Sequence, residues 1–223
     1  FDGKALTWML IGYGFVAAVL PVWLLLAPRD YLSTFLKLGT VFLLAAAVLV
    51  AMPELHMPAL TKFTDGSGPV FPGTLFPFLF ITIACGAVSG WHSLVSSGTT
   101  PKLLANEADA RMIGYGGMLL ECFVAVTALV AACALQPGVY FALNSPAAAI
   151  GTDVHSAAAA ISQWGFVVTP EMLQKTAADI GEASILSRTG GAPTLAVGMA
   201  NILSQLFAGP GMLAFWYHYA ILF

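Results

Sequence analysis

The sequence predicts an all-α integral membrane protein, a polytopic helix bundle in which residues 1–223 form a single transmembrane domain. Of the 223 residues, 59% are hydrophobic and only 9% are charged, whereas soluble domains average about 25% charged residues. Long apolar stretches recur along the chain, and about 20 such residues cross a bilayer as a helix. The net charge of −3 and the lack of a basic run argue against a nucleic-acid-binding protein.

The first half of the chain contains four predicted spans. The first is an uncharged apolar run that Pro21 should kink, which membrane helices tolerate. Residues 28–30 should form a polar turn before the second span, and a loop rich in Pro and Gly should separate the second span from the third. A single charge, Glu121, interrupts the fourth. The predicted spans are residues 6–27, 34–52, 73–96 and 112–135.

The pattern changes in the second half. Residues 144–168 are too polar for lipid contact, so we expect a re-entrant helix or one buried in the bundle. Thr169-Pro170-Glu171 has the cap, the proline and the acidic first turn of a helix start, and residues 170–187 should form a charged surface helix. Apolar segments follow at 194–207 and 212–223. The last is too short to span a bilayer, and the chain begins with Phe1, so we expect an internal fragment of a longer protein.

Loop charges predict the orientation of the bundle. Arg29 and Lys37 lie between the first two spans, and Lys102 and Arg111 lie between the third and fourth. The positive-inside rule places both loops in the cytoplasm.

The segment 71–111 begins as a membrane helix, almost wholly apolar from 74 to 87, and its part 86–102 is rich in small and hydroxylic residues. A hydrocarbon core allows such a segment only where it lines protein or a water-filled cavity. Its hydroxyls and backbone amides suit a carboxylate, as in the broken helices of transporters. A phosphate loop is excluded because the GxxxxGK(S/T) spacing is missing. The residues expected along a substrate path are Ser89, Gly90, His92, Ser96, Ser97, Gly98, Thr99 and Thr100.

Three ionisable residues are candidates for carrying a coupling proton: Glu121, Asp153 and His155. Glu121 is the only acid well inside a predicted span, where an ionisable group usually faces a cavity, a partner or a proton path. The alternative is a hydrogen bond to a neighbouring helix. Asp153 and His155 would not share a helix face, so they should line a polar path or form a structural pair; a metal site is not expected.

Other patterns narrow the function further. Asn201, Ser204 and Gln205 share one helical face and predict a polar contact between helices. No cofactor or metal motif occurs, and the lack of a catalytic signature favours a transporter over an enzyme.

Long blocks of the sequence also resemble the carbon starvation protein A family. They are GAVSGWHSLVSSGTTPK (86–102), EADARMIGYGGMLLE (107–121), GTDVHSAAAAISQWG (151–165) and GGAPTLAVGMA with AFWYHYAILF. The resemblance implies a multi-pass carrier of the bacterial inner membrane for peptides or pyruvate, energised by an ion gradient, with protons favoured, and linked to nutrient starvation. It also implies an inverted-repeat bundle with broken helices, like that of the amino acid–polyamine–organocation transporters.

The resulting hypothesis is a secondary active transporter. Its expected partners are a small-molecule substrate, a coupling proton or cation, the lipid bilayer and the missing helices of the parent chain. A membrane nutrient sensor or structural subunit without transport is the alternative, and an intramembrane enzyme is a weaker one. The sequence leaves the choice between peptide and pyruvate open.

Overall fold

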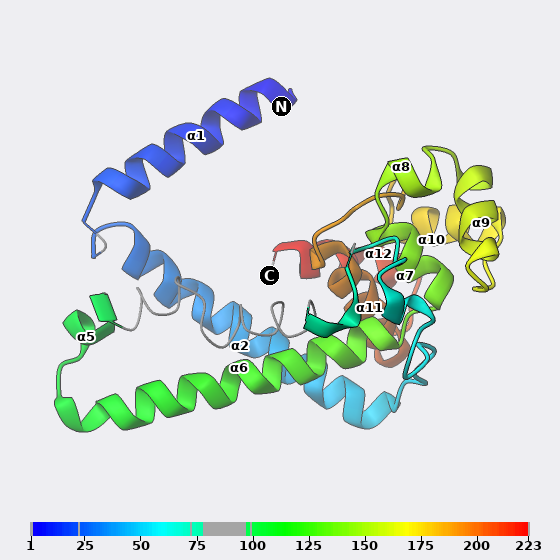
Figure 1. Cartoon of the computed structure of the whole chain (residues 1–223). Coiled ribbons are helices and arrows are strands. Elements are labelled where there is room, and N and C mark those ends of the chain that lie inside the picture. The colour runs from blue at the N-terminus through cyan, green and yellow to red at the C-terminus, as the bar shows by residue number, and fades with distance from the viewer. Residues whose placement is uncertain (1, 22, 72, 78–96, 99, 223) are drawn as a thin grey trace. The chain divides into compact units, whose positions relative to one another are not determined.

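The computed structural model describes residues 2–21, 23–71, 73–77, 97–98 and 100–222, and the regular structure of these residues is entirely helical. The chain divides into two compact units, the first ending at Ala45 and the second running from Ala46 to Leu222. The helices labelled in Figure 1 are α1 (Gly3–Val19), α2 (Leu26–Ala51), α5 (Thr100–Leu103), α6 (Ala110–Cys133), α7 (Pro137–Asn144), α8 (Ala147–Ile150), α9 (Val154–Gln163), α10 (Pro170–Asp179), α11 (Ala192–Leu206) and α12 (Met212–Leu222). Two short 3-10 helices cover Phe63–Asp65 and Glu107–Asp109.

The first predicted span is shorter in the structure than the sequence suggested. Helix α1 ends at Val19, and Leu20 is extended, with φ −73° and ψ 148°, because a following proline disfavours helical backbone. Pro21 therefore ends the helix instead of kinking it, and the prediction of one helix over residues 6–27 was wrong. The predicted turn at residues 28–30 was also wrong. Pro28 lies in the first turn of α2, where backbone N–H groups have no partner within the helix and a proline is tolerated.

Helix α6 is long and apolar but contributes little to the interior of the chain. Residues Glu107–Cys133 are apolar enough to cross a membrane: an 18-residue window within them has a mean hydropathy of 2.0, yet only 11% of that window is buried. In Figure 1 it extends as a long green helix away from the helices α7 to α12. A helix that leaves its apolar side chains uncovered needs an apolar environment outside the chain. Together with the composition, this indicates an integral membrane protein.

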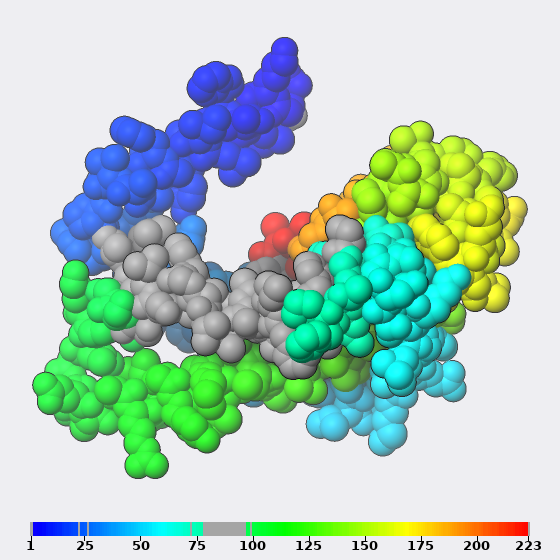
Figure 2. Space-filling view, in the orientation of Figure 1, coloured from blue at the N-terminus to red at the C-terminus, as the bar shows by residue number. Residues whose placement is uncertain are grey.

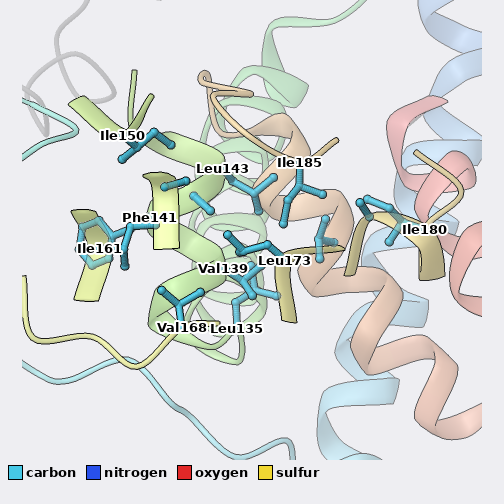
Figure 3. Packing of buried hydrophobic residues seen from close by; sticks show 14 of the residues in the cluster. Leu135, Val139, Phe141, Leu143, Ile150, Ile161, Val168, Leu173, Ile180 and Ile185 are labelled. Carbon is cyan, nitrogen blue, oxygen red and sulfur yellow. The ribbon is translucent and has the colours of Figure 1, made fainter. Parts of the chain in front are cut away.

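The buried core lies among the short helices that follow α6. Side chains from α7, α9, α10 and the loop before α11 form one cluster, in which Phe141, Ile161, Leu173 and Ile185 are almost completely buried (Figure 3). Helix α11 packs against α12 and also contacts α6. The α6–α11 contact requires Gly198, because a Cβ there would lie 2.3 Å from the backbone oxygen of Ala131 in α6.

The loop between α2 and the predicted third span folds onto this core. Phe63 packs edge-on against Phe141 and Trp164, with ring centroids 5.6 and 6.3 Å apart. Figure 2 shows the loop (cyan) against α8 and α9 (yellow-green). The backbone N–H groups of His56 and Met57 donate to the carbonyl of Cys133 at 2.8 and 3.2 Å. These bonds satisfy the end of α6 and fix the loop beside it.

The start of α10 confirms the predicted capping pattern. The Thr169 hydroxyl accepts a hydrogen bond from the backbone N–H of Met172 at 3.2 Å, Pro170 is the first helical residue and Glu171 lies in the first turn. The helix ends at Asp179 instead of continuing to Ser187. The polar stretch at 144–168 forms the two short helices α8 and α9, and α9 buries one face in the core.

Candidate functional site at the start of α11

Most of the predicted substrate-path residues lie outside the described part of the chain. Ser89, Gly90, His92, Ser96 and Thr99 are in this group, so their role stays a prediction.

The remaining three, Ser97, Gly98 and Thr100, lie at and just before the start of α5. Ser97 is exposed, whereas Gly98 and Thr100 are half-buried. They precede the loop that leads into α6.

Glu121 lies near the middle of α6 and is exposed on the surface of the described chain. Gly114 and Gly117 precede it by seven and four positions and therefore lie close to the same helix face. A Cβ at either glycine would meet no atom within 4 Å. A carboxylate on a face of small residues in an apolar helix would be costly in lipid, so this face needs a polar environment or a partner.

Asp153 has a local structural role. It is the N-cap of α9, and its carboxylate accepts hydrogen bonds from the backbone N–H groups of His155 at 2.9 Å and Ser156 at 3.4 Å. The hydroxyl of Ser156 donates back to the Asp153 carbonyl at 2.8 Å. The structure therefore gives Asp153 a capping hydrogen bond from the backbone of His155, and its place on a polar path stays a prediction.

His155 itself is exposed at the start of α9. Its charge lies close enough to Glu171 to contribute to the lowered pKa of that carboxyl, after the larger effects of the Glu171 backbone and the Thr169 hydroxyl. The three predicted proton carriers thus lie on two separate helices, with Glu121 on α6 and the other two at the start of α9.

A cavity of about 740 Å³ lies where α6, α7 and the start of α11 meet, and we call it the first cavity. Small side chains of α6 form one wall, and the backbone of Gly190 and Gly191 forms another. These two glycines have φ values of 115° and 82°, which only glycine adopts readily. They break the chain directly before α11, so the first turn of that helix faces the cavity. The residues that give the cavity its polar character are Tyr140, Asn144, Thr189 and Thr194.

Asn144 and Thr194 form a buried polar pair on the wall of the first cavity. The Asn144 amide nitrogen donates to the Thr194 hydroxyl at 2.6 Å and to the carbonyl of Tyr140 at 2.9 Å. Asn144 is 8% exposed and Thr194 is 4% exposed. The hydrogen bond joins residues that are 50 positions apart, the last of α7 and the third of α11. A buried polar group is costly without a partner, so this bond holds the cavity wall in one arrangement.

The first cavity suits a small carboxylate. Thr194 accepts from Asn144 through its oxygen, which leaves its own hydroxyl proton available as a donor. The start of an α-helix carries partial positive charge and favours anions. Apolar side chains such as Ala128, Ala132 and Leu195 cover much of the remaining wall. An anionic group at the helix start and a short apolar body along α6 would complement these features.

Comparison with known proteins shows where the chain belongs. Residues 1–223 match the family described as carbon starvation protein CstA. The chain is a member of this family. It is 67% identical to the "Peptide transporter CstA" of Escherichia coli (strain K12) and 58% identical to that of Helicobacter pylori (strain ATCC 700392 / 26695). It is 56% identical to the "Pyruvate/proton symporter BtsT" of Escherichia coli (strain K12). No solved structure matches the chain.

These carbon starvation relatives are all named as transporters, and none of the three names describes an enzyme. Each comparison covers all of this chain but only 32 to 34% of the relative. The chain therefore spans about a third of the length of the curated relatives that it matches.

This chain of the carbon starvation family also contains an ion-pair network that the sequence did not reveal. In the loop between α10 and α11, Arg188 donates to the Glu182 carboxylate at 2.7 Å and to the hydroxyl of Tyr217 in α12 at 3.0 Å. The hydrogen bond from Arg188 lowers the pKa of Glu182 below its ordinary value. Glu182 therefore stays ionised at neutral pH, which makes it a structural anion rather than a proton carrier. Tyr217 is 1% exposed, so the network ties the loop to the buried face of α12.

Proposed function

We propose that the chain forms part of a secondary active transporter that takes up small carboxylate nutrients, peptides or pyruvate, driven by protons. The observation that carries the proposal is the first cavity, in which a helix start and the Asn144–Thr194 pair face a half-open space beside a membrane-type helix. The relatives' names, peptide transporter and pyruvate/proton symporter, support the substrate class and the coupling ion. The family description links the activity to carbon starvation.

The proposed setting is the bacterial inner membrane, crossed several times by an inverted-repeat bundle. In folds of this type, substrates bind near the bilayer midplane, where discontinuous helices expose their ends. The break at Gly190 and Gly191 before α11 fits that arrangement. The start of α2, with Arg29, and helix α5, with Lys102, would lie in the cytoplasm.

The substrate would reach the first cavity along the small and hydroxylic residues of the 86–102 segment. Ser89, His92, Ser96 and Thr99 would line this route with Gly90. Their hydroxyl and imidazole groups can exchange hydrogen bonds with a carboxylate as it moves.

Ser97, Gly98 and Thr100 would extend the same route as far as α5. The half-buried position of Gly98 and Thr100 supports this part of the proposal.

Glu121 is the proposed main carrier of the coupling proton, with Asp153 or His155 as the second group. Its place on a small-residue face of an apolar helix supports a role that requires close approach of another polar group. The Asp153 carboxylate already accepts two backbone hydrogen bonds as the cap of α9, so it is engaged in holding the start of that helix. We therefore place the exchange of protons at Glu121 and, next, at His155.

Uptake measurements test the transport function. The protein in its natural full length would be expressed in bacteria, and uptake of labelled pyruvate and of a labelled dipeptide would be followed with and without a protonophore. The proposal predicts protonophore-sensitive uptake of at least one of them. A membrane nutrient sensor or structural subunit would be inserted correctly and take up neither.

A second experiment tests the proton carrier. Glu121→Gln, reconstituted in proteoliposomes, should lose substrate-driven proton uptake while still binding substrate. Unchanged coupling would remove Glu121 from the mechanism.

A further inference from the structure

A second cavity, of about 410 Å³, lies at the other end of α11. It is bounded by the end of α6, the start of α7, α10 and the last turns of α11. The polar face that the sequence predicted for α11 points into it rather than into a contact between helices. Its polar lining residues are His56, Gln136, Thr176, Asp179, Asn201, Ser204 and Gln205.

Three of these residues, Thr176, Ser204 and Asp179, present hydrogen-bond acceptors to the cavity. The Thr176 hydroxyl donates to the carbonyl of Met172 at 2.9 Å, and the Ser204 hydroxyl donates to the carbonyl of Asn201 at 3.0 Å. Both hydroxyl protons are therefore used within the helices, and each oxygen presents lone pairs to the cavity. Asp179, the last residue of α10, adds a carboxylate that is exposed to the cavity.

The rest of the wall is apolar, and the cavity is too large for a bare ion. Leu135, Val139, Met172 and Leu213 contribute side chains to it. An inorganic cation would need several oxygen ligands close together and no apolar surface. An organic ammonium group attached to a short carbon skeleton uses both kinds of wall, because its three N–H donors meet the acceptors and its skeleton meets the apolar side chains.

We infer that the second cavity is a binding site for the ammonium group of a peptide or amino acid, with Asp179 as its counter-ion. Asn201 and Gln205 present carboxamides, each of which can donate to and accept from a peptide bond. His56 is the other titratable residue on the cavity, at its edge beside the end of α6. This inference rests on the proposed transport function only in its choice of solute.

The site is distinct from the first cavity. Thr194 and Ser204 are ten residues apart on α11, which corresponds to about 15 Å along a helix. The backbone contact between Gly198 and Ala131 lies between the two cavities. A solute with an ammonium group would be recognised at the second cavity, whereas pyruvate, which has no ammonium group, would use only the first.

A binding measurement on the purified full-length protein tests this assignment. The probes are alanyl-alanine, N-acetyl-alanyl-alanine and pyruvate, and the readout is the dissociation constant from calorimetry. The wild-type protein should bind alanyl-alanine at least about tenfold more tightly than the acetylated form, and Asp179→Asn should remove this difference. Gln205→Ala, at an exposed position, should weaken the dipeptide as well. Glu171→Gln is the matched control, since it removes an acid at the other end of α10, and should change nothing.

The outcomes separate this inference from the transport proposal. The inference would be overturned if the wild type and Asp179→Asn bound alanyl-alanine with equal affinity. It would also be overturned if the wild type did not bind the dipeptide. Binding that depends on Asp179 in a protein without gradient-driven uptake would leave the site in place and refute transport. Normal uptake together with dipeptide binding that is independent of Asp179 would support transport and refute the site.

Discussion

Gly198→Ala is the sharpest test of how α6 and α11 meet between the two cavities. An added Cβ would lie 2.3 Å from the oxygen and 2.7 Å from the carbonyl carbon of Ala131, both backbone atoms that cannot rotate away. The oxygen distance is about 0.7 Å below the 3.0 Å minimum that real Cβ contacts show, so the helices must separate. Overpacking of this kind lowers the free energy of unfolding by about 1–3 kcal/mol, and the higher helix propensity of alanine offsets at most about 1 kcal/mol of this loss.

The assay is thermal unfolding of the purified protein, with Gly116→Ala in α6 as the control. A Cβ at Gly116 would meet nothing within 4 Å, so that variant should keep or slightly raise the melting temperature through helix propensity alone. Gly198→Ala should lower it, by about 2–4 °C for each kcal/mol lost in a chain of this size. If Gly198→Ala were as stable as the control, the close backbone contact between α6 and α11 would be refuted.

Three further variants test the other interactions described above. Thr194→Val removes one of the two partners of the buried Asn144 amide and should cost about 1–3 kcal/mol, measured by thermal unfolding; an unchanged melting temperature would contradict the pair. Glu182→Gln should destabilise the protein at neutral pH but not at low pH. Because the pKa of Glu182 is below its ordinary 4.5 when folded, the stabilisation by Arg188 is present above about pH 4.5 and is lost as the pH falls through the folded pKa; a difference that persisted in acid would refute the pair. Asp153→Asn should keep its stability, since asparagine caps helices equally well, whereas Asp153→Ala should lose about 1 kcal/mol of stability. Because the asparagine variant keeps the cap, a loss of proton coupling in this variant would reveal a role of Asp153 beyond capping.

Local patterns in the sequence predicted local structure well. Thr169 and Pro170 cap and start α10 as expected, because the signal depends on neighbouring residues alone. The helix predicted at 112–135 corresponds to α6 at Ala110–Cys133. The hydrophobic pattern predicted the wrong end for the first helix, because the apolar run continues past Pro21 whereas α1 ends before it. The apolar pattern reports preference for lipid, and it does not register the backbone restriction that a proline imposes on Leu20.

The candidate site could be predicted only in part. The polar face of α11 was visible in the sequence, but what it faces was not. Thr194 is 50 residues from Asn144, and Tyr217 is 29 residues from Arg188; no local pattern encodes such pairings. A single polar residue at the end of the apolar run of α7 was the one signal that could have drawn attention to Asn144.

The central claim is that the first cavity holds a carboxylate substrate during proton-driven uptake. The most direct measurement is uptake of labelled pyruvate by cells expressing the full-length protein, comparing wild type and Thr194→Val at equal membrane levels, with and without a protonophore. We expect protonophore-sensitive uptake of pyruvate in the wild type and a marked loss of this uptake in Thr194→Val. Uptake that is equal in both would remove the first cavity from the substrate path, and no uptake of pyruvate or dipeptide in the wild type would contradict the transporter itself.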